Sequence, residues 1–259
     1  MLYKTFLAEL KKSQHTFVPW LTLSGSLLVP LVCFLIYCFK WKYFIPETGV
    51  NSWDEYTQMS LSFASGMLFP FLVIIMVALN INLENKANSW KRLYVMPVGR
   101  DTLFWGKLLF LSMQLLICSV FMFFWILLTG LFLGIMHPEL LFLEYSPDIF
   151  NLLMLSLRFF ISLLGVLSIQ YFLSLLLNNI IVPITAGVML VIVSLMLVQG
   201  WEYSVYDPYA FPLLFSWNNS GKMVQIAWWG LLKTEWLSML YYIVFSIMAM
   251  VLFKRKPVR

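Results

Sequence analysis

Charged residues are scarce in this chain. They make up 11% of its 259 residues, whereas 61% of the residues are hydrophobic. An ordinary soluble domain has roughly 25% charged residues. Because a water-soluble fold could not hide this much apolar surface, the composition excludes a soluble globular domain and predicts a protein embedded in a lipid bilayer.

Cysteine and histidine are rare as well, with three and two copies. Cys33, Cys38 and Cys118 all lie in apolar runs, where cysteine behaves as a small hydrophobic residue, so the sequence indicates neither a disulfide framework nor a redox centre. His15 and His137 fall on opposite sides of the predicted membrane, without a second ligand at a suitable spacing. We therefore predict no metal site.

Sequence signatures of catalysis are missing too. A phosphate-binding loop needs Gly-x-x-x-x-Gly-Lys followed by Ser or Thr, but an apolar residue follows both Gly106-Lys107 and Gly221-Lys222. No Asp-rich motif or His-Glu pair on a helix suggests an intramembrane protease or a lipid transferase. We predict no catalytic residues and no cofactor on this chain, so any ATP hydrolysis must take place on another chain.

The long apolar runs predict the fold. A helix needs about 20 mostly apolar residues to cross the hydrocarbon layer, and the runs are too long for the strands of a membrane barrel. The sequence therefore predicts an all-α integral membrane protein with a single domain over residues 1–259. The six predicted spans are Phe17–Phe39, Met59–Ile81, Leu108–Met136, Ile149–Leu177, Ile180–Val198 and Leu237–Phe253.

The distribution of charge predicts the orientation. Cytoplasmic loops are enriched in Lys and Arg, and six spans place both termini on one side. That side holds twelve cations: Lys4, Lys11, Lys12, Lys86, Lys91, Arg92, Arg100, Lys107, Lys254, Arg255, Lys256 and Arg259. It holds three anions, Glu9, Glu84 and Asp101, whereas the other side holds four cations and nine anions. We therefore predict a multi-pass protein of the cell membrane with cytoplasmic termini; the net positive charge needs no nucleic acid as a partner.

Two segments outside the spans have patterns of their own. Apolar residues of the segment 1–14 fall on one helical face, which is typical of a helix in the membrane interface, although a frayed basic tail remains an alternative. The outer loop 199–235 is rich in Trp, and its part Lys222–Leu232 is apolar but too short to span. We predict that this part re-enters or lies on the outer leaflet.

The loop 82–102 is the most informative segment. Ser89 could cap a short helix in which Trp90, Leu93 and Tyr94 share one face, and Pro97 would help to end it. Such an amphipathic helix needs a partner, which could be the membrane surface or a groove on a soluble protein. The composition leaves both alternatives open.

The same loop carries a resemblance. Glu84, the Trp90–Tyr94 helix, the stretch Met96-Pro97-Val98-Gly99-Arg100 and Lys107 together resemble the first cytoplasmic loop of ABC type-2 transporter permeases, which are the membrane subunits of ATP-binding-cassette exporters. The predicted layout also resembles that family over the whole chain: an interfacial N-terminal helix, six spans and a re-entrant outer segment. The small size is most similar to that of the permeases of lantibiotic and other peptide-antibiotic immunity systems.

The resemblance implies a division of labour. Two separate ATPase subunits, which would hold ATP and Mg, would dock on the coupling helix, and the permease would pair with a second copy or a homologous permease. Trp90, Leu93 and Tyr94 would be buried anchors, and Lys91, Arg92 and Arg100 rim or phosphate-facing charges. Glu84 and Pro97 complete the implied docking set, with Glu84 paired to a basic residue. The cargo would be hydrophobic or amphipathic, such as an antimicrobial peptide; alternatives are an ion-gradient-driven carrier and a non-transporting scaffold or sensor subunit.

Arg158 is the one charge inside a predicted span. An unpaired cation at that depth is costly and often functional. Snorkelling to the outer interface or pairing with Glu144 or Asp148 would explain it, and so would a place on the path of a substrate.

Overall fold

A computed structural model describes residues 2–14, 18–46, 49–86, 99–177, 179–219 and 230–255. Six of its helices are long and apolar enough to cross a membrane, which confirms the predicted all-α, multi-pass fold. These six helices cover Pro19–Phe39, Ser52–Leu83, Arg100–Met136, Ile149–Leu176, Ile181–Val198 and Lys233–Arg255.

Short 3-10 or π-helical turns lie between several of the helices. In order, the elements are α1 (Leu2–Gln14), α2 (Val18–Phe39), η1 (Trp41–Tyr43), α3 (Ser52–Phe63), η2 (Ala64–Leu68), α4 (Phe69–Lys86), α6 (Arg100–Met136), η3 (Pro138–Leu140), α7 (Ile149–Leu176), α8 (Ile181–Val198), η4 (Glu202–Tyr206), α9 (Phe211–Asn219) and α10 (Lys233–Arg255). The element η2 is a π-helical turn that joins α3 and α4 into one continuous span.

Two spans are longer than their hydropathy predicts. The second begins at Ser52 and the third at Arg100, ahead of the predicted starts at Met59 and Leu108. At 1.5 Å per residue the 37 residues of α6 extend about 55 Å, well beyond a hydrocarbon layer of about 30 Å. The apolar run marks only the part of each helix that can face lipid, whereas the added turns pack against other parts of the protein.

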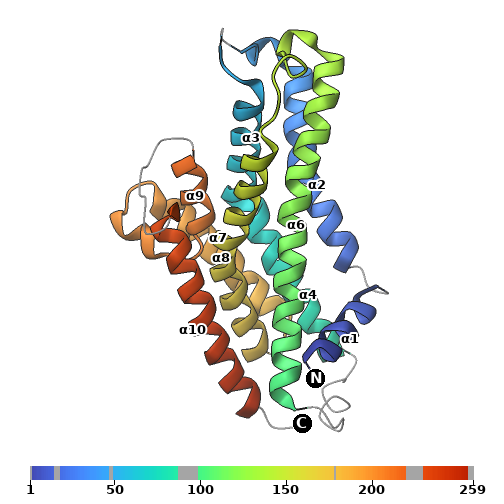
Figure 1. The fold of residues 1–259 in the computed structure, drawn as a ribbon. Helices are drawn as coiled ribbons and strands as arrows, with labels where there is room; N and C mark the ends of the chain where they lie inside the picture. Colours follow the sequence, from blue (N-terminus) through green and yellow to red (C-terminus); the bar gives the residue numbers. More distant parts are fainter. Residues whose placement is uncertain are drawn as a thin grey trace.

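The bundle has two distinct ends (Figure 1). The N-terminal helix α1, the start of α6 and the end of α10 lie together at one end, which we call the terminal end. The end of α6, the start of α3 and the 3-10 turn η1 lie at the opposite end, which we call the far end. The short helix α9 lies partway along the bundle, near the start of α10.

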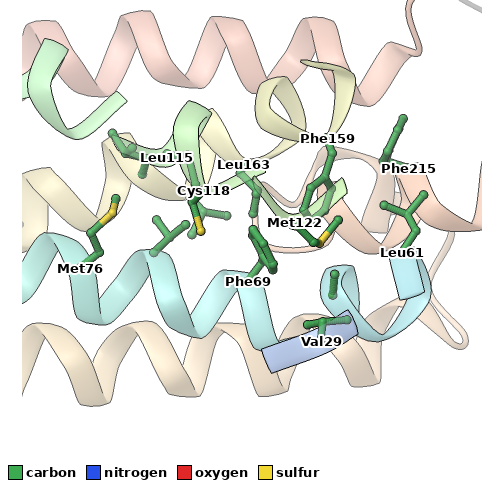
Figure 2. Close-up of a cluster of buried hydrophobic side chains, with 14 of the residues drawn as sticks. Val29, Leu61, Phe69, Met76, Leu115, Cys118, Met122, Phe159, Leu163 and Phe215 are labelled. Carbon is green, nitrogen blue, oxygen red and sulfur yellow. The ribbon is translucent and has the colours of Figure 1, made fainter. Parts of the chain in front are cut away.

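The core runs through the middle of the bundle, where α2, α4, α6 and α7 meet. Figure 2 shows part of it, with side chains from several elements converging on one cluster. Phe69 and Phe159 pack edge to face with ring centroids 5.1 Å apart, which joins α4 to α7. The labelled core residues are Val29, Leu61, Phe69, Met76, Leu115, Cys118, Met122, Phe159, Leu163 and Phe215.

Trp53 organises the far end. Its indole is 2% exposed, and its Nε1–H is 3.0 Å from the carbonyl oxygens of both Phe142 and Tyr145. Gly130 on α6 leaves room for the ring, since a Cβ there would lie 2.5 Å from it. The segment between α6 and α7 is thereby held against the start of α3.

The predicted outer loop contains structure of its own. Residues 211–219 form α9, which packs on α3, α7 and α10. Most of the predicted re-entrant part, Lys222–Leu232, lies outside the described residues, so its re-entry stays a prediction. The helix α1 covers the segment predicted for the interface, and its place in that interface is a prediction as well.

Candidate functional site

The terminal end carries the clearest cluster of polar contacts near the predicted coupling loop. Helix α1 lies against the first turns of α6, where the hydroxyl of Thr5 donates to the carbonyl oxygen of Thr102 at 3.2 Å. A Cβ on Gly106 would lie 2.6 Å from Thr5 Oγ1. The absence of a side chain at Gly106 therefore allows the two helices to approach closely.

A buried lysine joins the same two helices. Lys107 lies near the start of α6, directly before the predicted apolar run, and yet it is only 4% exposed. Its Nζ is 3.6 Å from Oε1 of Glu9 on α1. Because an ammonium group away from water needs an anionic partner, this contact explains how the helix can bury Lys107.

Two further contacts tie the start of α6 to the end of α10. Arg100 Nη1 donates to the carbonyl oxygen of Lys254 at 2.8 Å, and Lys254 Nζ is 2.9 Å from Oδ1 of Asp101. The carbonyl at a helix C-terminus lacks a partner within the helix and carries a partial negative charge, which the Arg100 guanidinium complements. Arg100, near the end of the coupling loop, is thus bound to the last span.

The predicted docking residues are only partly within the described chain. Of these docking residues, only Arg100 has a side chain in the part of the chain that the structure describes. Glu84 lies on the last turns of α4, but its side chain is outside the described residues, and so is the whole segment 87–98. This segment contains the remaining docking residues, which are Trp90, Lys91, Arg92, Leu93, Tyr94 and Pro97. Their role stays a prediction.

The sequence matches one protein-family model, described as "ABC-2 family transporter protein", over residues 5–194. The match extends from α1 to α8 and includes the coupling loop, Arg100 and the Lys107–Glu9 pair. The chain belongs to the ABC-2 transporter family. No curated protein matches its sequence. This assigns the chain as the permease component of a transporter, with the substrate open.

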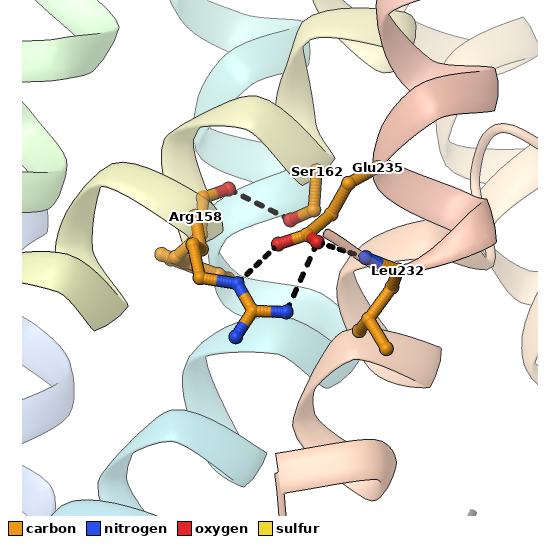
Figure 3. Close-up of polar contacts among 5 residues, drawn as sticks. Arg158, Ser162, Leu232 and Glu235 are labelled. Carbon is orange, nitrogen blue, oxygen red and sulfur yellow. Dashed lines mark hydrogen bonds and ion pairs between the residues drawn. The ribbon is translucent and has the colours of Figure 1, made fainter. Parts of the chain in front are cut away.

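A charged pair joins α7 to α10 inside this ABC-2 permease (Figure 3), near the start of α10 and so away from the terminal end. Arg158 on α7 faces Glu235 on α10, and its Nε and Nη2 donate to Oε1 and Oε2 at 2.8 and 3.1 Å. Glu235 is fully buried, whereas 29% of the Arg158 side chain is exposed. The guanidinium also lies over the ring of Phe215, 5.6 Å from its centroid. Two parallel hydrogen bonds and an aromatic face are the environment that stabilises a partly buried arginine.

The partner of Arg158 corrects the sequence-based prediction. The sequence predicts Glu144 or Asp148, but Asp148 caps the start of α7 by accepting from the backbone N–H of Asn151 at 3.0 Å. By its hydropathy Glu235 belongs to the outer loop, because the sixth apolar run begins only at Leu237. The helix begins at Lys233 instead, which brings Glu235 inside. A place for Arg158 on a substrate path stays a prediction.

Glu235 also caps the helix that it begins. Glu235 is the third residue of α10, and its Oε2 accepts from the backbone N–H of Leu232, as the acid of a capping box does. Below this turn Ser238 extends the polar seam, since its hydroxyl donates to the carbonyl oxygen of Ile161 at 2.7 Å and accepts from Gly165 N–H at 2.9 Å. Helices α7 and α10 are therefore joined by polar contacts between small residues as well as by the ion pair.

Metal ligands do not gather in the described part of this ABC-2 permease. Among those residues, no three His, Cys, Asp or Glu side chains lie close enough to hold one ion. Cys33 and Cys118 are buried and unpaired with another cysteine, and Cys38 is partly buried. The terminal end and the α7–α10 pair remain the sites with the most specific geometry.

Proposed function

We propose that this permease works as the membrane half of an ATP-driven exporter, in which two copies of the chain, or one copy and a homologous permease, associate with two separate ATPase subunits. The family match over residues 5–194 carries this proposal, because it includes the loop that resembles a coupling helix. ABC-2 permeases generally pair with ATPase subunits. We further propose that both termini face the cytoplasm and that the cargo is hydrophobic or amphipathic, such as an antimicrobial peptide.

The terminal end supports a mechanical role for the loop. Glu84 lies near the beginning of the loop, on α4, and Arg100 lies near its end, at the start of α6. Through Arg100 and Asp101 the loop connects to α10, and through Lys107 to α1. If a closing ATPase displaced the loop, the movement would therefore reach α6, α10 and α1 together, because packed elements move as a unit in domain-scale switches.

Docking can be tested by co-purification. The chain would be co-expressed with an ABC ATPase encoded in the same operon, with Trp90, Leu93 and Tyr94 replaced by Asp in the test variant. We expect the complex to be lost, because charged side chains cannot fill the apolar pockets that aromatic anchors occupy. A matched control replaces Trp201 and Tyr203, two exposed aromatic residues outside the coupling loop, and should leave the complex intact. A complex that survives the triple replacement would contradict the docking role.

The energy source needs its own measurement. Flux in reconstituted vesicles should require the ATPase subunit and ATP, and should continue after an uncoupler has abolished the proton gradient. Transport that needs no ATPase and stops with the uncoupler would instead establish a gradient-driven carrier. Absence of both flux and stimulated ATP hydrolysis with an intact complex would point to a scaffold or sensor subunit.

A further inference from the structure

Arg158 has hydrogen-bonding capacity that Glu235 does not use. A guanidinium group has five N–H donors, and Glu235 accepts from only two of them, on Nε and Nη2. The third nitrogen, Nη1, points away from Glu235 (Figure 3) and has no acceptor among the described residues. It is not enclosed either, and 29% of the Arg158 side chain is exposed. One edge of the guanidinium, formed by Nη1 and the second N–H of Nη2, is therefore open at the protein surface.

The residues around α10 place this edge relative to the membrane. Although Arg158 lies in the third turn of α7, its partner Glu235 is only the third residue of α10. The next residue, Trp236, is 43% exposed, and the turn η4, which contacts α10, presents the exposed rings of Tyr203 and Tyr206. Exposed Trp and Tyr gather where a membrane meets water. The open edge thus lies at the head-group level of the leaflet opposite the terminal end.

The surface of α7 beside the guanidinium is apolar. Met154, one helical turn before Arg158, and Leu157, directly before it, are 42% and 37% exposed. In a membrane protein such residues face acyl chains. The polar group within reach of the open edge is therefore the head of a lipid whose chain lies along α7.

The guanidinium is held in place without any ligand. Its two hydrogen bonds to the fully buried Glu235 fix its plane, and Phe215 covers it with a ring whose centroid is 5.6 Å away. Glu235 is itself fixed by the backbone N–H of Leu232. Because the Arg158 side chain has already lost its rotational freedom, a ligand at the open edge pays little further side-chain entropy.

Phosphate is the lipid group that fits this edge. Two phosphate oxygens accept from two parallel N–H groups of an arginine, with the same geometry as a carboxylate. We propose that the open edge of Arg158 binds the phosphodiester of an anionic phospholipid, so that the guanidinium bridges Glu235 and the lipid. Met154 and Leu157 contact the acyl chain. This site is independent of the proposed transport function, because the chain alone provides it.

Native mass spectrometry of the full chain in detergent, without any ATPase, tests the binding separately from transport. Dioleoylphosphatidylglycerol is titrated, and the fraction of the chain that carries one lipid is measured. We expect the first lipid to bind about tenfold more tightly than the lipids that follow, as a pair of charge-assisted hydrogen bonds provides. Galactosyl dioleoylglycerol, which has the same chains and no phosphate, should show no preferred first site. Glycerophosphoglycerol, the same phosphodiester without chains, should not displace the lipid.

Two variants separate the guanidinium from the ion pair. Glu235→Gln leaves the open edge of Arg158 in place and removes the competing anion, so the first lipid should bind at least as tightly as in the parent protein, although the variant is less stable. The further replacement Arg158→Met recovers stability yet removes the phosphate ligand, and should weaken the first site by about tenfold. If Glu235→Gln fails to fold, the double variant, which has no unpaired charge, is compared directly with the parent protein.

Lys233→Gln is the matched control. Lys233 is an exposed cation two residues from Glu235, so it reports any diffuse attraction of anionic head groups to this part of the surface. We expect its replacement to change the affinity of the first site by less than about twofold.

Four results would overturn the proposal: no preferred first lipid, an equal first site for the galactosyl lipid, displacement by glycerophosphoglycerol, or a double variant that binds the first lipid as tightly as the parent protein or loses no more than Lys233→Gln does.

Discussion

Arg158 and Glu235 are 77 residues apart in the chain, yet their side chains form a two-pronged ion pair between α7 and α10, with N···O distances of 2.8 and 3.1 Å. The pair lies in the part of the bundle where these helices also share the Ser238 contacts. Its position within two membrane-spanning helices makes it costly to disrupt, because the fully buried Glu235 has no water to replace its partner.

Replacing Glu235 with Gln tests the ion pair while keeping the helix cap, since Gln serves equally at this position of a capping box. We expect a loss of about 3 kcal/mol, at the lower end for buried pairs because Arg158 is partly exposed. Thermal unfolding in detergent measures this loss. A second replacement, Arg158→Met, should recover much of it by removing the unpaired charge. Glu202→Gln, at an exposed acid of η4, is the control. Equal stability of Glu235→Gln and the parent protein would show that the pair contributes nothing.

Gly130 tests how tightly Trp53 is packed at the far end. A Cβ at residue 130 would lie 2.5 Å from the Trp53 indole. The ring cannot easily move aside, because its Nε1–H donates to the carbonyl oxygens of Phe142 and Tyr145. Gly130→Ala should therefore destabilise the protein by about 1–3 kcal/mol, as overpacking does in other cores. Gly200→Ala, where no atom lies within 4 Å, should change stability far less. Unfolding temperatures of the two variants provide the comparison, and similar values would contradict the close packing of Trp53.

Gly106 tests the attachment of α1. A leucine at this position would collide with Thr5 and separate α1 from α6. Lys4, Lys11 and Lys12 are exposed on α1, so we expect faster tryptic cleavage of the N-terminal segment in Gly106→Leu than in the parent protein. The matched control is Gly66→Leu, since Gly66 has no neighbouring atom within 4 Å. Unchanged cleavage in Gly106→Leu would mean that α1 does not depend on this contact.

Tyr209 lies between η4 and α9, and its stabilising effect should depend on pH. Its hydroxyl is buried without a partner among the described residues. Burial raises the pKa of Tyr209, and the Asp207 carboxylate raises this pKa further. A tyrosine in the unfolded chain loses its proton near pH 10. Because the folded state keeps this proton to higher pH, folding stability is complete below about pH 10 and decreases above it.

Tyr209→Phe removes both effects. We expect this variant to be more stable by about 1 kcal/mol at neutral pH, since it no longer buries an unsatisfied hydroxyl. Its stability should also decline less than that of the parent protein between about pH 10 and 11. Chemical unfolding in detergent at several pH values measures both. A parallel pH profile for the two proteins would show that Tyr209 ionises as freely in the folded state as in the unfolded one.

Particular residues show why the sequence predicts some features and not others. The core of each span was predictable, because lipid forces about 20 apolar residues into a helix wherever they occur. The start of α10 was not, since Lys233, Thr234 and Glu235 are polar and look like loop. Their helical turn is stabilised by the Arg158 guanidinium of α7, which pairs with Glu235, and by the cap that Glu235 provides for Leu232. The same holds for α6, whose first turns bury Lys107 against Glu9.

Unlike the α7–α10 ion pair, the candidate docking residues can be recognised in the sequence alone. The pattern Trp90, Leu93 and Tyr94 is local, with spacings of one helical turn, so it can be recognised without any knowledge of the fold. The cavity of about 330 Å³ that Asp54 of α3 and Asp148, the N-cap of α7, line together is the opposite case. These residues lie 94 positions apart, and nothing in either local sequence predicts that the two helix starts lie side by side.

The sequence by itself determined that this protein is a six-span helical membrane protein without a phosphate-binding loop, since apolar length and hydrogen-bond satisfaction in lipid decide these features one segment at a time. It also indicated the family, through a loop motif that is contiguous in the chain. Only the tertiary structure decided which charges meet: Arg158 with Glu235, Lys107 with Glu9, and Arg100 with the end of α10. An ion pair depends on the relative position and rotation of two packed helices, and this relation arises from side-chain packing between distant segments, which no single stretch of sequence contains.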